Sequence, residues 1–181
     1  MKILVIVDEQ KDFTNGVLGN AECEATVGKI VDIVNTQDFD RVILTRDTHS
    51  NNYLDTQEGK NLPVVHCIEG SDGWQIRDEI MQAVKHKYSE NENYHVIDKR
   101  TFGSLYLGKW IESNYILEQA DLEITFVGVC TGICVISNAI ITKAALPEAK
   151  ISVIADACAC VTPESHKTAL EAMKMCQISV I

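Results

Sequence analysis

Short, nearly continuous apolar runs recur along the chain, separated by segments of mixed polarity. Runs in which apolar residues do not alternate with polar ones are typical of strands buried on both faces of a parallel sheet. Six runs predict strands over Ile3–Val7, Arg41–Thr45, His95–Ile97, Ile124–Val127, Ile151–Ile154 and Ile178–Val180.

Apolar residues three or four positions apart predict helices between these strands. Val27, Ile30 and Val34, for example, share one helical face. Thr162 followed by Pro163 is typical of a helix N-terminus. The predicted helices span Ala21–Val34, Lys109–Gln119, Ile133–Ala145 and Glu164–Met175. Strands that alternate with helices predict an α/β fold, a three-layer doubly wound sandwich with a six-stranded parallel sheet and helices on both faces.

Length and charge narrow the class of protein. The chain has 181 residues, and we predict that 1–181 form a single domain. A net charge of −10, with no basic run, argues against a nucleic-acid partner. No apolar run reaches the roughly 18 residues of a membrane span. We therefore expect no membrane partner.

The seven cysteines are odd in number and scattered. The first residues, Met1-Lys2 before Ile3–Val7, lack the long apolar region of an export signal. We therefore expect free thiols in a cytoplasmic protein. Cys158 and Cys160 lack Cys-x-x-Cys spacing and are interpreted as packing.

Polar residues that suit catalysis follow the predicted strands. Asp8 follows the first strand, Asp47 the second, and Lys99 the third, while Cys134 lies beside the helix after the fourth. The carboxyl ends of parallel strands meet at one edge of a sheet, where ligands bind. We expect these side chains to meet there.

Cys134 is a candidate nucleophile. The N–H groups and dipole of a helix N-terminus favour an anion and form an oxyanion hole. Such a position can lower the pKa of a thiol to about 3.5–7.5. Lys99 would add a cation, and Asp8 would take the proton. The alternative is that Cys134 is a buried packing residue.

Asp47, His49 and His66 form a candidate metal site. Aspartate and histidine ligands suit Zn²⁺, Fe²⁺ or Mn²⁺, and three ligands leave positions open for water or substrate. Glu58 lies between the histidines and is a candidate fourth ligand. The alternative is that both histidines make ordinary loop and interior hydrogen bonds.

Four aromatic residues lie in the loops and helix starts near these strand ends. They are candidates for the wall of a flat substrate pocket, with ordinary packing as the alternative: Phe13, Trp74, Phe102 and Tyr106.

Together these motifs resemble the isochorismatase-like cysteine hydrolase family, over essentially the whole chain. They also resemble its nicotinamidase/pyrazinamidase branch, because that branch carries the metal motif. The matching segments, in order, are Asp8-x-Gln10-x-Asp12-Phe13, Asp47-Thr48-His49, His66-Cys67, Lys99 and Gly128-x-x-Thr131-x-x-Cys134.

The resemblance implies a cysteine amidohydrolase that converts nicotinamide to nicotinate and ammonia in NAD salvage, and that also accepts pyrazinamide. Asp8, Lys99 and Cys134 would be catalytic, and a Cys134 thioester would form. The N–H groups of Cys130 and Cys134 would form the oxyanion hole. The cofactor would be a divalent metal, with Zn first and Fe or Mn as alternatives. A homo-oligomer is also implied.

Two other functions remain open at this point. The first is hydrolysis of another small amide, a carbamoyl compound or a vinyl ether by the same family. The second is a catalytically silent α/β domain that binds a ligand or a partner.

Overall fold

The computed structural model describes residues 1–89 and 92–181, and these residues contain one six-stranded sheet. All its strand pairs are parallel, in the order β3-β2-β1-β4-β5-β6. The predicted parallel α/β sheet is therefore confirmed. The strands are β1 (Lys2–Val7), β2 (Arg41–Asp47), β3 (Tyr94–Lys99), β4 (Glu123–Val129), β5 (Lys150–Ala159) and β6 (Ser179–Val180).

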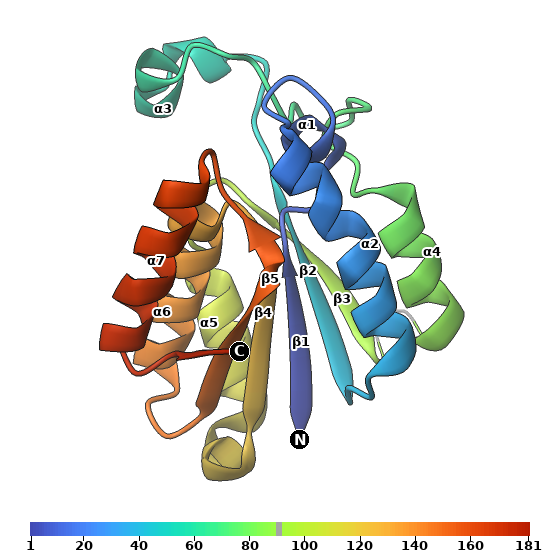
Figure 1. Ribbon diagram of the computed structural model, residues 1–181, viewed down its shortest axis with the longest axis vertical. Helices are drawn as coiled ribbons and strands as arrows, with labels where there is room; N and C mark the ends of the chain where they lie inside the picture. Colours follow the sequence, from blue (N-terminus) through green and yellow to red (C-terminus); the bar gives the residue numbers. More distant parts are fainter. Residues whose placement is uncertain (90–91) are drawn as a thin grey trace.

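Helices cover both faces of the sheet, as Figure 1 shows. On one side lie α2 (Ala21–Thr36) and α4 (Asp78–Lys87); on the other lie α5 (Leu105–Tyr115), α6 (Ile136–Ala145) and α7 (Pro163–Met175). Successive side chains of a strand point to opposite faces. In β1, Ile3, Val5 and Val7 pack toward α5, α6 and α7, whereas Leu4 and Ile6 pack toward α2 and α4.

Short helical segments occupy the loops. Figure 1 shows α1 (Lys11–Thr14) and α3 (Gln57–Asn61) above the carboxyl ends of the strands. Two 3₁₀ segments, η1 (Tyr53–Asp55) and η2 (Ile116–Asp121), precede α3 and β4. The π-helical turn η3 (Thr131–Val135) links β4 to α6.

The helix predictions differ from the structure most at α4, α5 and α6. The apolar spacing did not predict α4, because this helix is short and polar overall and buries only Ile80, Ala83 and Val84. Helix α5 begins at Leu105, before the predicted 109, because the Ser104 side chain caps it by accepting a hydrogen bond from the Leu107 N–H. The segment predicted as one helix over 133–145 begins as the η3 turn and becomes α-helical only from residue 136.

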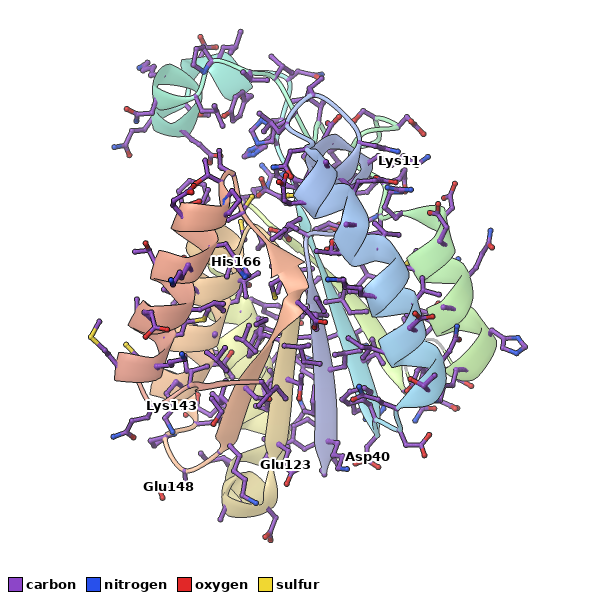
Figure 2. The ribbon with its side chains drawn as sticks, in the orientation of Figure 1. Lys11, Asp40, Glu123, Lys143, Glu148 and His166 are labelled. Atoms are coloured by element: carbon purple, nitrogen blue, oxygen red, sulfur yellow. The ribbon has the colours of Figure 1, made fainter. Side chains whose placement is uncertain are left out.

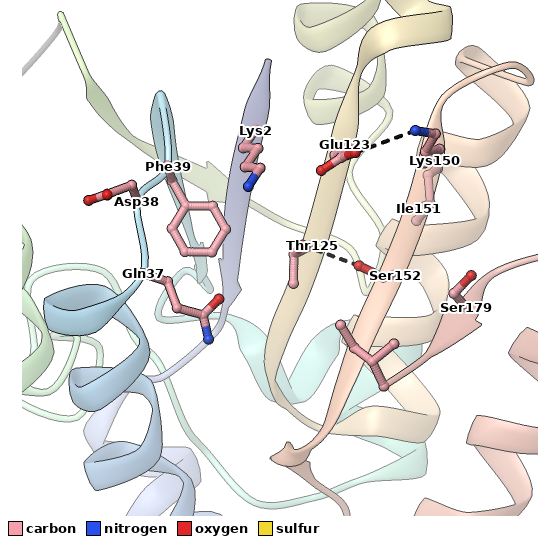
Figure 3. A pocket seen from close by; sticks show the side chains of 11 residues that line it. Lys2, Gln37, Asp38, Phe39, Glu123, Thr125, Lys150, Ile151, Ser152 and Ser179 are labelled. Atoms are coloured by element: carbon pink, nitrogen blue, oxygen red, sulfur yellow. Dashed lines mark hydrogen bonds and ion pairs between the residues drawn. The ribbon is translucent and has the colours of Figure 1, made fainter.

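The two ends of the sheet differ in character. At the amino ends of the strands, a groove of about 480 Å³ is lined by mostly polar side chains, including Lys2, Thr125 and Ser152 (Figure 3). Asp40 and Glu123 lie at the same end (Figure 2). None of the predicted site residues lines this groove.

Within residues 1–89 and 92–181, no helix combines the length and the apolar character that crossing a bilayer requires.

Candidate active site

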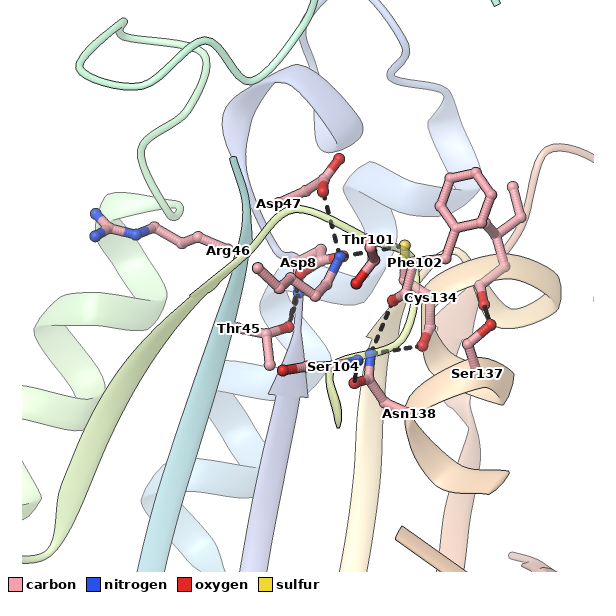
Figure 4. A network of polar contacts seen from close by, with 12 residues as sticks. Asp8, Thr45, Arg46, Asp47, Thr101, Phe102, Ser104, Cys134, Ser137 and Asn138 are labelled. Carbon is pink, nitrogen blue, oxygen red and sulfur yellow. Dashed lines mark hydrogen bonds and ion pairs between the residues drawn. The ribbon is translucent and has the colours of Figure 1, made fainter. Parts of the chain in front are cut away.

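Asp8, Lys99 and Cys134 meet at the carboxyl ends of β1, β3 and β4. Figure 4 shows Asp8 and Cys134 at this edge. The ammonium Nζ of Lys99 lies 2.6 Å from Oδ2 of Asp8 and 3.6 Å from Sγ of Cys134. All three side chains are buried. The sheet thus brings together three residues that are up to 126 positions apart in sequence (8 to 134).

The position of Asp8 is fixed by the neighbouring strand. Thr45 of β2 donates a 2.6 Å hydrogen bond from its hydroxyl to Oδ1 of Asp8, and its carbonyl accepts from the Asp8 N–H at 3.2 Å. The backbone of Asp8 has a φ of 49°, a left-handed conformation that is rare for a residue with a side chain. Backbone strain of this kind clusters at functional sites.

Burial controls the protonation of this group. It raises the pKa of the Cys134 thiol well above its ordinary value, and the charge of Asp8 raises it further, although Lys99 opposes the change. This outcome differs from the sequence-based expectation of a lowered pKa, because desolvation outweighs the helix N-terminus. Burial alone would lower the pKa of Lys99, but the charge of Asp8 and, more weakly, that of Asp47 raise it. Lys99 is therefore a cation that donates to Sγ of Cys134 at 3.6 Å, and Cys134 is a neutral thiol.

The turn that carries Cys134 is held from two sides. The carbonyl of Cys130 accepts hydrogen bonds from the N–H groups of Ile133 and Val135, which closes the turn. Asn138 is fully buried one helical turn after Cys134, and it donates to the Cys134 carbonyl at 2.8 Å and to the Phe102 carbonyl at 3.1 Å. The Val129–Cys130 peptide bond is cis. Cys130 and Cys134 thus lie at the N-terminal end of a helical segment, where N–H groups are free of intrahelical partners.

A second cluster lies beside the first. Nε2 of His49 is 2.9 Å from Oδ2 of Asp47 and 3.6 Å from Oε1 of Glu58. Nε2 of His66 is 3.8 Å from the same Asp47 oxygen and 4.0 Å from the same Glu58 oxygen. The four ligand atoms all lie within 4.8 Å of one another. Lys99 links the two clusters, because its Nζ is also 3.4 Å from Oδ1 of Asp47.

The donor set of this cluster fits a divalent metal. Nδ1 of His66 lies 2.7 Å from the Val64 carbonyl, to which it can donate. This hydrogen bond leaves the lone pair of Nε2 free, and Nε2 lies close to the other ligand atoms. Hydrogen bonds of this kind, made by the ring nitrogen that does not bind the metal, orient metal-binding histidines. Two carboxylates and two imidazoles are a usual ligand set for Zn²⁺, Fe²⁺ or Mn²⁺.

Backbone contacts bring the ligands together. The His49 N–H donates to the Cys67 carbonyl at 2.9 Å, which places the segment after β2 alongside the segment that carries His66. The side chain of Gln10 makes hydrogen bonds with both the N–H and the carbonyl of Asp47.

One cavity of about 210 Å³ connects the two clusters. Asp47, Glu58 and His66 line one part of it, and Cys130 and Cys134 line another. Phe13 and Phe102 line it too, so the structure brings two of the four predicted aromatic residues to the cavity. The remaining lining residues are Leu18, Asn20, Leu62, Ile133 and Val161.

The structure places the other two predicted aromatic residues, Trp74 and Tyr106, outside the cavity. The indole of Trp74 stacks 3.6 Å from the Arg46 guanidinium, and its N–H donates to the Thr48 hydroxyl. Tyr106 lies on the exposed face of α5, with 62% of its surface accessible. Sequence position near a strand end does not determine which way a loop side chain points.

Two groups of site residues were not predicted from the sequence. The aliphatic residues Leu18, Leu62, Ile133 and Val161 carry no chemical signal, and only the fold collects them. Asn138 carries a weak signal, as a polar residue four positions after Cys134 in an otherwise apolar helix.

Comparison with known proteins gives a family match over nearly the whole chain and a relative that covers about three quarters of it. The isochorismatase domain family matches residues 2–181. The nicotinamidase of Saccharomyces cerevisiae is 28% identical, with 77% of this chain and 80% of that protein covered.

Two solved structures have the same fold. The yeast nicotinamidase bound to the inhibitor nicotinaldehyde matches with a TM-score of 0.81 at 23% identity, covering 100% of this chain and 99% of that one. The pyrazinamidase of Pyrococcus horikoshii in complex with zinc matches with a TM-score of 0.75 at 20% identity, covering 99% and 98%.

Proposed function

Because the chain belongs to the isochorismatase family, we propose that it is a nicotinamidase, a metal-containing cysteine amidohydrolase that converts nicotinamide to nicotinate and ammonia. Pyrazinamide is a second expected substrate. The single observation that carries the proposal is that one cavity of about 210 Å³ is lined both by Cys134 and by Asp47, Glu58 and His66. The similarity to the yeast nicotinamidase supports the choice of amide.

Cys134 is the nucleophile in this proposal. Its sulfur attacks the carboxamide carbonyl carbon, and its proton passes to Asp8. Lys99 holds the two groups together, with Nζ 2.6 Å from the Asp8 carboxylate and 3.6 Å from the Cys134 sulfur. The N–H groups of Cys130 and Cys134 stabilise the oxyanion, and a single such donor is worth roughly 2.7–4 kcal/mol in the transition state.

Asp8 then returns the proton to the departing nitrogen. Release of ammonia leaves the acyl group as a thioester on Cys134, and water hydrolyses this thioester to the carboxylic acid and the free thiol. Lys99 holds Asp8 at 2.6 Å throughout and keeps a positive charge beside the sulfur. The protonated, buried thiol becomes nucleophilic only when Asp8 takes its proton.

Asp47, His49 and His66, with Glu58 as fourth ligand, would hold the divalent metal, which we expect to be Zn²⁺, with Fe²⁺ or Mn²⁺ as alternatives. When bound, the metal supplies a Lewis-acidic coordination position for the ring nitrogen of a pyridine. Three of these residues, Asp47, Glu58 and His66, themselves line the cavity that Cys134 also lines.

The charge of the cavity argues for a neutral substrate. No Lys or Arg is among the described residues that line it, and the cation nearest the site, Lys99, is paired with Asp8. A doubly anionic vinyl ether such as isochorismate would therefore lose its solvation without gaining a cationic side chain, and the carboxylates of Asp47 and Glu58 would offset the charge of a bound metal. A small uncharged amide carries no such penalty.

The test is ammonia release from nicotinamide, measured on the protein as purified, after chelator treatment, and after add-back of Zn²⁺, Fe²⁺ or Mn²⁺. We expect activity to fall with chelation and to return with metal. Benzamide is the matched control substrate, because it has the same shape and lacks the ring nitrogen. We expect a much higher KM for benzamide in the metal-loaded protein.

Other results would refute the proposal in distinguishable ways. If nicotinamide and pyrazinamide release no ammonia in any metal state, the substrate is wrong. If no small amide is hydrolysed in any metal state, a silent ligand- or partner-binding domain replaces the enzyme.

The setting of the reaction stays a prediction from the sequence. We propose a role in NAD salvage, a cytoplasmic location and a homo-oligomer. Size-exclusion chromatography with light scattering measures the oligomeric state directly.

A further inference from the structure

Three thiols meet behind the turn that carries the nucleophile. Cys130 packs against a buried cluster that contains Cys23 and Ala159, the residue before Cys160. Sγ of Cys160 lies against the same turn, 3.3 Å from the position that a β-carbon on Gly132 would take. Sγ of Cys23 also lies 3.9 Å from the Cys160 carbonyl oxygen. These thiols come from η3, the end of β5 and the start of α2. The proposed mechanism uses only the backbone N–H of Cys130, so it leaves all three sulfurs without a role.

The sheet places Cys130 directly beside Cys160. The preceding residues, Val129 and Ala159, are paired in the parallel ladder of β4 and β5. Neighbouring strands lie about 4.8 Å apart. Disulfides join residues whose Cα atoms are about 4.4–6.8 Å apart. The register therefore suits a Cys130–Cys160 disulfide.

Cys160 lies in a setting that stabilises a thiolate. Hydrogen bonds from the Cys130 thiol, the Ser165 hydroxyl and the N–H groups of Gly132 and Val161 outweigh its burial and lower the pKa of Cys160 to about 5. The neighbouring Cys160 sulfur, together with burial, raises the pKa of Cys130, which stays a thiol. A thiolate next to a thiol is the arrangement from which oxidation to a disulfide begins.

Small oxidants can approach this pair from two sides. Cys160 lines a hollow of about 290 Å³ between α2 and α7, together with Lys29 and His166. It also lines a second hollow beside Gly132. Cys130 is partly exposed and lines the substrate cavity.

We propose that Cys160 and Cys130 form an oxidative modification site for hydrogen peroxide, at which a reversible disulfide switches off the amidase. The effect on activity rests on the proposed function, whereas formation of the disulfide does not. The Cys160 thiolate attacks peroxide, giving a sulfenic acid and hydroxide. The Cys130 thiol then attacks that sulfur, forming the S–S bond and releasing water. In sum, two thiols and one peroxide give one disulfide and two waters.

The disulfide disturbs the oxyanion hole. Drawing the two sulfurs to the roughly 2.05 Å of an S–S bond shifts the Cys130 backbone, whose N–H is the proposed oxyanion donor. The same turn carries Cys134, because the Cys130 carbonyl accepts from the N–H groups of Ile133 and Val135. A misplacement of about 1 Å at a catalytic group costs roughly 100-fold in rate. We expect kcat to fall by about 10- to 100-fold.

The experiment treats the zinc-loaded protein with a few equivalents of hydrogen peroxide, removes the peroxide with catalase, and blocks free thiols with N-ethylmaleimide. Non-reducing trypsin digestion leaves Cys130 and Cys134 on peptide 110–143, and Cys158 and Cys160 on peptide 151–167. Mass spectrometry then detects the cross-linked pair, and fragmentation assigns the two cysteines. We expect a Cys130–Cys160 link that dithiothreitol removes, with recovery of activity.

Cys160→Ser and Cys176→Ser are the test and control variants. Cys176 is exposed and distant in sequence from the cluster. We expect both to have the activity of the natural protein before oxidation, and only Cys160→Ser to keep it after the same peroxide dose. A link through Cys23 or Cys158, or no link at all, would overturn the proposal. So would equal inactivation of Cys160→Ser, because direct oxidation of Cys134 would then be the cause. If nicotinamide is not a substrate, the cross-link still reports on the site.

Discussion

Glu9 is a buried carboxyl group whose charge the fold disfavours. It follows Asp8 in sequence and is completely inaccessible to solvent. Thr26 donates a 2.8 Å hydrogen bond to Oε1, whereas Oε2 has no hydrogen-bond partner among the described residues. Burial raises the pKa of Glu9 from 4.5 to about 8, against the opposing effect of the Thr26 hydrogen bond. Glu9 therefore makes stability depend on pH.

The sign and size of this effect follow from linkage. Between the unfolded pKa of 4.5 and the folded pKa of about 8, the folded state binds the proton more tightly than the unfolded state does. Stability therefore falls as pH rises through this window. Each unit of pKa is worth about 1.4 kcal/mol, so the loss between pH 5 and pH 9 comes to about 4 kcal/mol.

Glu9→Gln removes the titration and keeps the shape and the acceptor for Thr26. The assay is urea unfolding of the metal-free natural protein and the variant at pH 5 and pH 9. We expect the free energy of unfolding of the variant, relative to the natural protein, to rise by about 4 kcal/mol between these pH values. Comparing the two proteins at each pH cancels the titration of all other groups. Glu164→Gln, at an exposed position, is the matched control and should give no such change.

One result would refute this reasoning. If the difference between the Glu9→Gln variant and the natural protein is the same at pH 5 and pH 9, then Glu9 does not stay protonated in the folded state. Water penetration or a closer contact with a cation such as Arg77 would then have to stabilise its charge.

Three further predictions concern the site. Cys134→Ala should abolish ammonia release while leaving the circular dichroism spectrum unchanged, because one small buried residue replaces another; measurable turnover would exclude Cys134 as the nucleophile. His49→Ala should lower the bound metal measured by elemental analysis and raise KM for nicotinamide, and full metal content would remove His49 from the ligand set. Asn138→Ala leaves the Cys134 and Phe102 carbonyls and the Ser104 N–H without their partner. It should lower the free energy of unfolding by about 2–4 kcal/mol in urea titrations, since buried polar groups cost free energy when unsatisfied; an unchanged midpoint would contradict this role.

The parallel sheet and the polar groups at the carboxyl ends of its strands are predictable from the amino-acid sequence alone. Apolar runs such as Ile3–Val7 must be buried on both faces, and strands of that kind form parallel sheets. Since parallel strands end at the same edge, the residues that follow them had to converge. The structure brings Asp8, Lys99 and Cys134 together as expected, and likewise Asp47, Glu58 and the two histidines.

The ionisation of these groups and the direction of loop side chains depend on contacts that form only in the folded chain. Burial raises the pKa of Cys134, although its place at a helix N-terminus suggested the reverse. Burial also keeps a proton on Glu9, whereas hydrogen-bond donors lower the pKa of Cys160 in spite of its burial. Loop side chains such as Trp74 turned away from the cavity for the same reason, because their partners are chosen in space. Periodicity records which residues are buried, but solvation and hydrogen bonding depend on neighbours that are distant in sequence.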